Sequence, residues 1–181
     1  MALSQCHKRT VSIISIALML LIGGDVLAQH KLRVKRKDVK SLKELAEAHP
    51  ETNYLVIKRA KLTELPKELA LFKQLDSIDL YGNKIENIPD SAWDLLSNVA
   101  YLRLGKNPIN YIPPGIAKLE KLRHLDLWNS DIYDFHPHLL TMDRLKLLDI
   151  RMTALSKAKV EEIVFVMQNT EVKTTRQCNC K

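Results

Sequence analysis

The chain carries few residues at spacings that could support catalysis. Glycine-rich loops that cradle phosphate are excluded, because only Gly82, Gly105 and Gly115 follow residue 28. The patterns G-x-S-x-G, H-E-x-x-H and C-x-x-C, which place a nucleophile, a metal-binding pair or a redox pair, do not occur. No nucleophile is matched with a base, so we expect a protein without enzyme activity and without a cofactor.

One pair of histidines has a spacing that could hold a metal ion. His136 and His138 are separated by one residue, and Asp131 and Asp134 lie nearby in the sequence. Imidazole and carboxylate groups are common metal ligands. The pair falls, however, where related stretches of the chain turn at a Leu-Pro or Ile-Pro step. A solvated turn is therefore the favoured interpretation, and no metal site is predicted.

The elements that must position functional side chains come from a repeat of about 23 residues. The copies are LVIKRAKLTELPKEL (Leu55–Leu69), IDLYGNKIENIPDSA (Ile78–Ala92), LRLGKNPINYIPPGI (Leu102–Ile116), LDLWNSDIYDFHPHL (Leu125–Leu139) and the shorter LDIRMTAL (Leu148–Leu155). Their first residues are spaced by 23, 24, 23 and 23. Self-similarity at a fixed period of this length indicates a stacked array, which offers a surface for binding.

Each copy fits the pattern L-x-L-x-x-N-x-I-x-x-I-P-x-x-I, which resembles the leucine-rich repeat. The form is similar to the 23-residue Leu-Pro or Ile-Pro type of the Ras-group repeat proteins and of many bacterial proteins. The resemblance covers Tyr54 to Leu155 closely and the flanks loosely. It implies an α/β fold, a leucine-rich-repeat solenoid with a curved parallel sheet on the concave side and short helices or irregular segments on the convex side.

The apolar positions of each copy predict one strand and a path back. The L-x-L step has the period of two expected of a strand, and Leu104 and Leu127 should be buried in the middle of the array. Proline follows at Pro66, Pro89 and Pro113, where it fixes φ as the chain bends away. The residues expected to cover the core from the convex side are Leu69, Ala92, Ile116 and Leu139.

The family pattern carries an asparagine at the sixth residue as written above, and its amide can satisfy buried backbone of the neighbouring coil. In this chain the position is occupied by Ala60, Asn83, Asn107, Ser130 and Thr153. Ala60 cannot form such a bond through its side chain. We therefore expect the array to be less regular near Ala60.

Degenerate segments should cover both ends of the repeats, which occupy residues 52–155. Residues 29–51 read as an N-terminal cap, with a helix over Asp38–His49 and Asp38 as its N-cap. Residues 156–181 read as a C-terminal cap: a helix from Ser156 to Gln168, an edge strand over Thr170–Arg176 and a polar tail. This ending resembles the closing segment of secreted repeat proteins from the Bacteroidota.

Residues 1–28 have the pattern of a secretory signal peptide. Lys8 and Arg9 precede the apolar run Val11–Gly24, which is too short for a comfortable membrane span. Val26 and Ala28 then give small residues at the −3 and −1 positions of a cleavage site. The prediction is a secreted protein, or one of the periplasm or cell envelope. Positive charge at the start of the mature chain opposes bacterial export and counts against this interpretation.

The chain is basic, with a net charge of +7 at pH 7. Much of the excess lies in residues 31–43, where seven basic side chains accompany a single acid, Asp38. This segment could attach the protein to an anionic envelope surface or glycan, or it could be a solvated cap. No nucleic-acid-binding module is visible, so nucleic acid is not expected as a partner.

The cysteines do not form a disulfide framework. Cys6 lies in the predicted signal peptide, which leaves Cys178 and Cys180 one residue apart in the tail. They could form a strained local disulfide, bridge to another chain, or have no defined role.

The family resemblance implies that a partner binds on the concave face. Side chains that alternate with the core leucines should form this face. The predicted partner-binding residues are Tyr54, Lys58, Asp79, Tyr81, Tyr101, Arg103, His124, Asp126, Trp128, Asp149 and Arg151. Tyr, Trp and Arg are common hot-spot residues, which favours a non-enzymatic module for protein or peptide binding. The alternative is a ladder of salt bridges with aromatic rings packed over Gly105.

Overall fold

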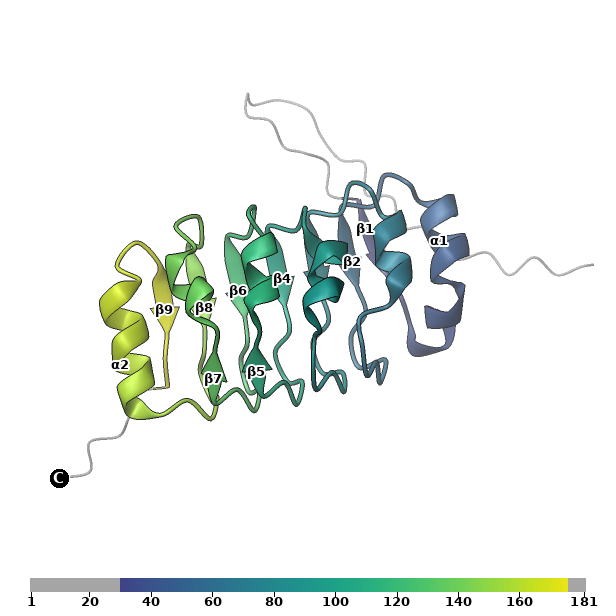
Figure 1. Cartoon of the computed structure of the whole chain (residues 1–181). Helices are drawn as coiled ribbons and strands as arrows, with labels where there is room; N and C mark the ends of the chain where they lie inside the picture. Colours follow the sequence, from purple (N-terminus) through teal and green to yellow (C-terminus); the bar gives the residue numbers. More distant parts are fainter. Residues whose placement is uncertain (1–29, 176–181) are drawn as a thin grey trace, which may run out of the picture.

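The computed structural model describes residues 30–175, which form a solenoid of stacked repeats (Figure 1). Its main sheet has seven strands, all parallel to their neighbours. In spatial order they are β1 (Lys31–Arg33), β2 (Tyr54–Val56), β3 (Ser77–Asp79), β4 (Tyr101–Arg103), β6 (His124–Asp126), β8 (Leu147–Asp149) and β9 (Glu171–Lys173). The predicted fold class is confirmed.

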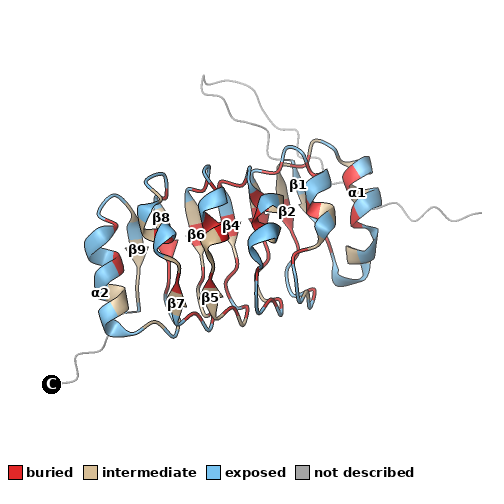
Figure 2. Cartoon of the chain, viewed as in Figure 1, coloured by how far each residue is buried: buried red, intermediate tan, exposed pale blue. Residues whose placement is uncertain are grey.

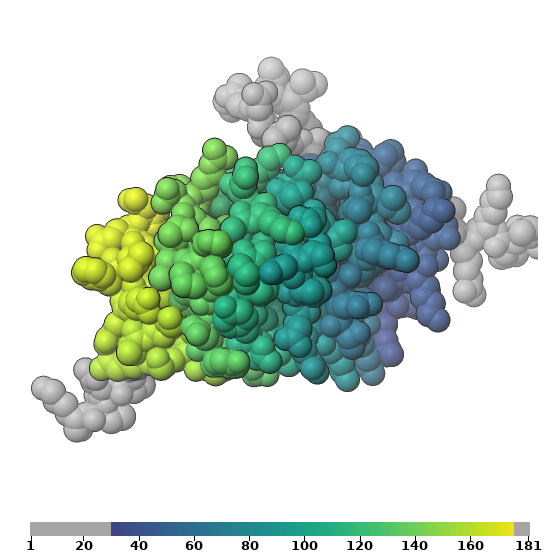
Figure 3. Space-filling model, viewed as in Figure 1, coloured from purple at the N-terminus to yellow at the C-terminus, as the bar shows by residue number. Residues whose placement is uncertain are grey.

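Short 3-10 helices form the opposite, convex side of the solenoid. They are η2 (Lys67–Leu71), η3 (Asp90–Leu96), η4 (Pro114–Lys118) and η5 (Pro137–Thr141). The residue before each helix has extended backbone, and in the first three repeats it is the predicted proline. A small parallel sheet of β5 (Tyr111–Ile112) and β7 (Asp134–Phe135) joins two repeats on the return path. The repeats follow one another without a gap along the array (Figure 3).

The core lies between the strands and the convex helices, where Figure 2 shows the buried segments. Leu104 and Leu127 are buried as predicted, with exposed fractions of 0% and 1%. At the convex position of the 24-residue repeat, the predicted Ala92 packs against the core but covers it only in part. Trp93 is fully buried there, while Ala92 is half-buried, because the extra residue lengthens η3. The Trp93 ring leaves no room for a side chain at Gly115 in the next repeat.

The asparagine ladder is built as the family pattern predicts. Asn83 accepts hydrogen bonds from the backbone N–H groups of Ala60 at 2.8 Å and Leu62 at 3.2 Å, so it satisfies the coil in which Ala60 stands. The pairing of β2 with both neighbours continues without a register shift. The irregularity expected near Ala60 is confined to a left-handed residue at Lys61, which follows the one at Arg59.

The two ends differ in how well the sequence predicted them. The N-terminal cap is a 3-10 helix, η1 (Arg36–Ser41), followed by α1 (Leu42–Ala48), so Asp38 lies inside η1 and is not an N-cap. At the other end α2 (Lys157–Val166) is capped by the Ser156 hydroxyl, which accepts from the N–H of Lys159 at 3.2 Å. α2 ends before the predicted Gln168, and the edge strand β9 follows it.

Two predictions fall outside the described residues. The signal peptide and its cleavage site lie before residue 30, and Cys178 and Cys180 lie after residue 175. Between residues 30 and 175, no helix combines the length and the apolar character needed to span a membrane.

Candidate partner-binding site

The strand register places seven of the eleven predicted partner-binding residues in two columns, and the other four, Lys58, Tyr81, Trp128 and Arg151, lie two residues after their strands. The first column contains Lys31, Tyr54, Ser77, Tyr101, His124, Leu147 and Glu171. The second contains Arg33, Val56, Asp79, Arg103, Asp126, Asp149 and Lys173. The sequence analysis did not assign Lys31, Arg33, Glu171 or Lys173 to this face. Lys31 and Arg33 could have been assigned, because they precede Tyr54 and Val56 by the 23 residues of the repeat.

Two aromatic rings meet in the middle of the face. Tyr81 and Trp128 come from turns that are two repeats apart, yet their ring centroids are 6.0 Å apart at an interplanar angle of 17°. Gly105 occupies the equivalent position in the repeat between them and is buried. A Cβ atom at Gly105 would lie 2.9 Å from the backbone oxygen of Trp128, so a glycine is needed where these repeats approach each other. Both rings remain half-buried, so each keeps some surface for a partner.

Arg103 connects the aromatic pair to the acidic column. Its guanidinium carbon lies 4.6 Å from the centroid of the Tyr81 ring, a cation–π contact. The Nε atom donates to Asp126 at 2.7 Å, and Nη1 lies 3.6 Å from the carboxylate of Asp79. The cross-strand pairing expected of these three residues is therefore present.

A second aromatic contact lies at one edge of the face. The Tyr101 ring packs edge-on against His124, with centroids 4.5 Å apart and an interplanar angle of 70°. Tyr101 is 42% exposed, which makes it the most accessible aromatic residue of the face. In the same column, the Lys31 ammonium lies 4.2 Å from the centre of the Tyr54 ring.

Carboxylates below the surface hold the turns that carry these side chains. Asp79 accepts from the backbone N–H of Tyr81 at 3.1 Å, and Asp126 accepts from that of Trp128 at 2.9 Å. Asp149 makes the same bond to Arg151 at 3.2 Å. An aspartate side chain commonly accepts a hydrogen bond from the backbone N–H two residues further on. The D-x-[Y/W/R] spacing in the sequence was therefore the signal that these aspartates hold the turns. Sequence reasoning did not use it.

In each of the five repeats, the residue three positions after the end of the strand has left-handed backbone. It is Arg59, Gly82, Lys106, Asn129 or Met152, with φ between 50° and 73°. Only one of the five is a glycine, so the other four bear a conformation that side chains disfavour. This left-handed conformation recurs at the same place in every repeat, so the residues before it, including Tyr81 and Trp128, occupy equivalent positions along the array.

The carboxylates are shielded while their cationic partners reach solvent. Asp79 and Asp149 have side chains that are 3% and 8% exposed, whereas Lys58, Arg103 and Arg151 are 41%, 42% and 47% exposed. The Lys58 ammonium contacts Asp79 at 2.7 Å, and Arg151 contacts Asp149 at 2.6 Å. On this face the cationic groups are therefore more exposed to solvent than the carboxylates of Asp79 and Asp149.

The ion pairs shift the titration of their members. Burial raises the pKa of Asp149, but the hydrogen bonds and the charge of Arg151 lower it by more, so the pKa lies below its ordinary value. Burial lowers the pKa of Arg103, and the carboxylates of Asp126 and Asp79 outweigh that effect and raise it. Both residues are charged at neutral pH, so the paired charges are permanent features of the face.

The histidine pair lies at the start of the convex helix η5, with His136 as its N-cap. His136 Nδ1 accepts from the backbone N–H of His138 at 3.3 Å, and the two rings are 4.4 Å apart on the convex side. Asp134 pairs instead with Lys159 at 3.4 Å. Within residues 30–175, no three His, Cys, Asp or Glu side chains are grouped as a metal ion would require.

The repeat geometry agrees with comparisons to known proteins. A family model described as a leucine-rich repeat region matches residues 26–172. The chain belongs to the leucine-rich-repeat family. This leucine-rich-repeat protein is 33% identical over 86 residues to Leucine-rich repeat-containing G-protein coupled receptor 5 of Rattus norvegicus. That match covers 47% of this chain and only 9% of the receptor.

Two solved bacterial leucine-rich-repeat structures are similar over most of the chain. A leucine-rich-repeat protein of Leptospira interrogans matches with a TM-score of 0.59 and 25% identity, over 72% of this chain and 33% of that one. Internalin C2 of Listeria monocytogenes matches with a TM-score of 0.60 and 24% identity, over 76% and 57% of the two chains. At that identity, the likeness to the internalin concerns the fold.

Proposed function

We propose that this leucine-rich-repeat protein binds a protein or peptide on its concave face and catalyses no reaction. The observation that carries the proposal is the cluster of Tyr81, Trp128 and Arg103, which lies near the middle of the sheet. Its rings are fixed by backbone bonds to carboxylates beneath them, and they do not fill the core. Rigid aromatic and arginine side chains of this kind are typical interface hot spots.

The geometry suggests how a partner would be held. A hydrophobic side chain of the partner would cover the exposed parts of the Trp128 and Tyr81 rings, while its acidic groups would approach Lys58 and Arg151. These cations already have carboxylate partners, so they are held in place before binding and lose little side-chain freedom when a complex forms. Tyr101 and His124 would extend the contact along the first column.

Two further observations support the proposal. Leucine-rich-repeat domains serve as protein-interaction modules, which agrees with a binding role. The signal-peptide pattern of residues 1–28 favours export of the protein. We therefore infer that the partner lies outside the cytoplasm, in the cell envelope or beyond it.

The test is capture of the partner by variants of the exported protein. Tagged protein is incubated with native envelope extract, and bound proteins are identified by mass spectrometry. Trp128→Ala should lose a partner that the unchanged protein retains, because truncating a central aromatic residue commonly costs about 2 kcal/mol or more of binding free energy. Thermal unfolding of the variant should be nearly unchanged, because the ring is not part of the core.

The matched control is Tyr133→Ala. Tyr133 is an aromatic residue with 61% exposure that lies outside the concave columns, so its removal should leave capture intact. The convex Lys118 is a poorer control, because its ammonium binds Asp94 at 2.8 Å and the carbonyl of Asp90 at 3.0 Å. Equal capture by Trp128→Ala and Tyr133→Ala would remove the basis for a concave site.

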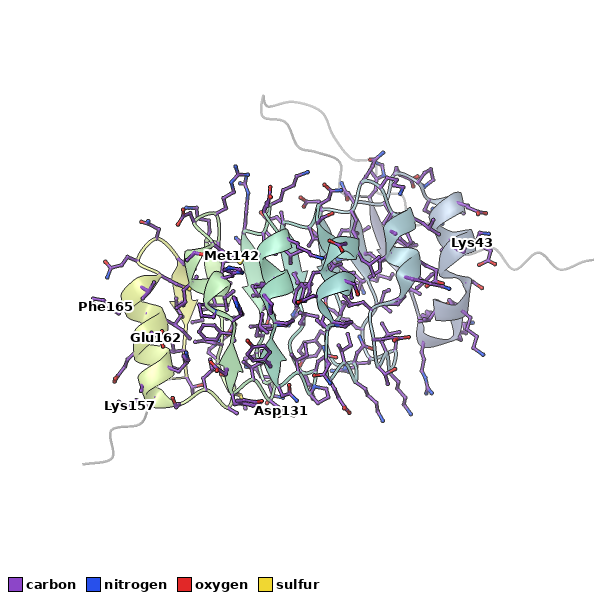
Figure 4. All side chains as sticks on the ribbon, in the orientation of Figure 1. Lys43, Asp131, Met142, Lys157, Glu162 and Phe165 are labelled. Carbon is purple, nitrogen blue, oxygen red and sulfur yellow. The ribbon has the colours of Figure 1, made fainter. Side chains whose placement is uncertain are left out.

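A second function, attachment to an anionic envelope surface, is favoured by one observation on the N-terminal cap. All seven basic residues of the segment 31–43 are exposed, and none lies within 4 Å of a described carboxylate. Figure 4 shows Lys43 at this end of the molecule. Attachment of this kind should be lost at high salt, because exposed charges are screened.

Vesicles of phosphatidylglycerol, with phosphatidylcholine vesicles as the neutral comparison, test this second function. Binding to the anionic vesicles at low salt that disappears in Lys35→Glu/Arg36→Glu/Lys37→Glu would support attachment. Equal binding to both vesicle types would contradict it. A partner that resists high salt but is lost in Trp128→Ala would favour the concave site.

A further inference from the structure

The last turn of the C-terminal helix exposes apolar side chains at the end of the solenoid, where a polar cap is normally needed. Ile163 of α2 and the C-cap residue Met167 face the core, while Val164, Phe165 and Val166 are 49%, 77% and 47% exposed. Phe165 is the most exposed large apolar side chain of residues 30–175. Figure 4 shows it at the far end of the molecule, away from the repeats, and Figure 1 shows β9 beside the same part of α2.

Within residues 30–175, one edge of strand β9 has no strand paired with it, at the same end of the solenoid. Among the described residues it pairs only with β8. The N–H of Glu171 donates to the carbonyl of Lys146 at 2.8 Å, and the carbonyl of Lys173 accepts from the N–H of Ile150 at 3.0 Å. Backbone groups of successive strand residues point to opposite sides, so the N–H and C=O of Val172 point away from β8, toward the open edge.

We propose that this end of the molecule binds a second copy of the same chain, with the two β9 strands antiparallel about a two-fold axis at Val172. Each Val172 would donate its N–H to the carbonyl of the other Val172, which completes the hydrogen bonding that the free edge lacks. An isologous contact of this kind closes at two copies. The two seven-stranded sheets would become one, with both concave faces on the same side.

The side chains of β9 are complementary to themselves in this arrangement. A two-fold axis at residue 172 places Glu171 opposite Lys173 of the second copy, and Lys173 opposite its Glu171. Within one chain the Glu171 carboxylate and the Lys173 ammonium lie 3.7 Å apart, and both side chains reach solvent, with 65% and 40% exposure. Thr170 falls opposite Thr174, which is another favourable cross-strand pair.

The other end of the sheet lacks this complementarity. Around Leu32 of β1, the same operation would place Lys31 opposite Arg33, and like charges directly opposite each other are destabilising. The difference selects the C-terminal end for self-association and leaves the N-terminal end unpaired, so the assembly does not grow into a filament.

The exposed residues of α2 would be covered in the same contact. A two-fold axis perpendicular to the sheet keeps the two α2 helices on one side of it. The Phe165 end of α2 lies beside β9, near the axis, whereas Lys157 lies at the far end of the helix (Figure 4). Phe165 and its neighbours would therefore pack against the same residues of the second copy.

Sedimentation of the full chain at increasing concentration tests the proposal, in reductant so that Cys178 and Cys180 cannot link chains. We expect a monomer–dimer equilibrium, with small-angle scattering that shows an elongated dimer. Phe165→Glu should give a monomer with an unchanged melting temperature, because the ring is exposed. Tyr133→Glu, an equivalent change at another exposed aromatic residue, should leave the dimer intact. A monomer at every concentration, or a dimer that Phe165→Glu does not weaken, overturns the proposal.

Charge reversal tests the strand register. Glu171→Lys places lysines opposite each other and Lys173→Glu places glutamates opposite each other, so each variant alone should dimerise roughly tenfold more weakly. An equal mixture of the two variants should recover a heterodimer, because every cross-strand pair then joins opposite charges. A mixture that associates no better than its components contradicts the antiparallel pairing at Val172.

Discussion

Replacing Asn83 with alanine should destabilise the protein more than any other single change in the asparagine ladder. The Asn83 side chain is buried and makes four hydrogen bonds to backbone. Its oxygen accepts from Ala60 and Leu62, and its nitrogen donates to the carbonyls of Ile57 and Leu80, each at 2.7 Å. The coil around Ala60 has no side chain of its own that could replace them.

The magnitude follows from the number of bonds. A typical intramolecular hydrogen bond contributes about 0.5–1.5 kcal/mol, so four of them give a loss of about 2–6 kcal/mol. Asn107 makes three bonds of 3.2 Å or shorter, to Ile85, Leu80 and Leu104, and should cost somewhat less. Ser130 makes one, to Leu127 at 2.7 Å, and its loss should cost about 1 kcal/mol.

Urea unfolding followed by circular dichroism measures the three alanine variants together. The exposed Asn87 provides the control, because it tests loss of an asparagine outside the ladder and should change the free energy of unfolding by less than about 0.5 kcal/mol. The expected order of destabilisation is Asn83, Asn107, Ser130 and Asn87. If Asn83→Ala cost no more than Ser130→Ala, the coil at Ala60 would not depend on the neighbouring repeat and the reasoning would be refuted.

Three further predictions follow from the core, the ion pairs and the N-terminus. Leu104→Ala and Leu127→Ala should each lower the free energy of unfolding by about 2–5 kcal/mol, and an unchanged urea midpoint would contradict a stacked core. The lowered pKa of Asp149 means that its contribution is complete above the ordinary carboxyl value of about 3.9 and is lost as pH falls through the lowered value. Arg151→Ala should therefore move acid unfolding, followed by circular dichroism, to higher pH. N-terminal sequencing of exported protein should find cleavage after Ala28, whereas mature protein that still begins at Met1 would point to a retained anchor.

The sequence was sufficient for the architecture because the repeat is a local pattern that recurs. The L-x-L step of each copy determines which residues alternate on a strand, and the fixed spacing then aligns Tyr101 with His124 and Arg103 with Asp126. The same spacing predicted the burial of Leu104 at the middle of the array.

What the sequence did not reveal depends on contacts between repeats. Trp93 fills the convex side because one extra residue rotates it inward, and the regular 14-residue offset from the strand pointed instead to Ala92. The Tyr81–Trp128 contact joins two strands that are not neighbours, so no pairing rule connects the two rings, although rings packed over Gly105 were an alternative considered from the sequence. At the N-terminal cap, Asp38 had the residue type of an N-cap but lies within a 3-10 helix that precedes α1.

Site-specific photo-cross-linking tests the concave site most directly. A benzophenone-bearing phenylalanine analogue replaces Tyr101, which is 42% exposed on the concave face, or Tyr133, which is 61% exposed away from it. A third variant carries the same analogue at Lys43, in the basic cap. Irradiation in native envelope extract should link the captured protein or peptide to position 101 and not to positions 133 or 43. Cross-links at position 43 or 133, with none at 101, would contradict binding on the concave face.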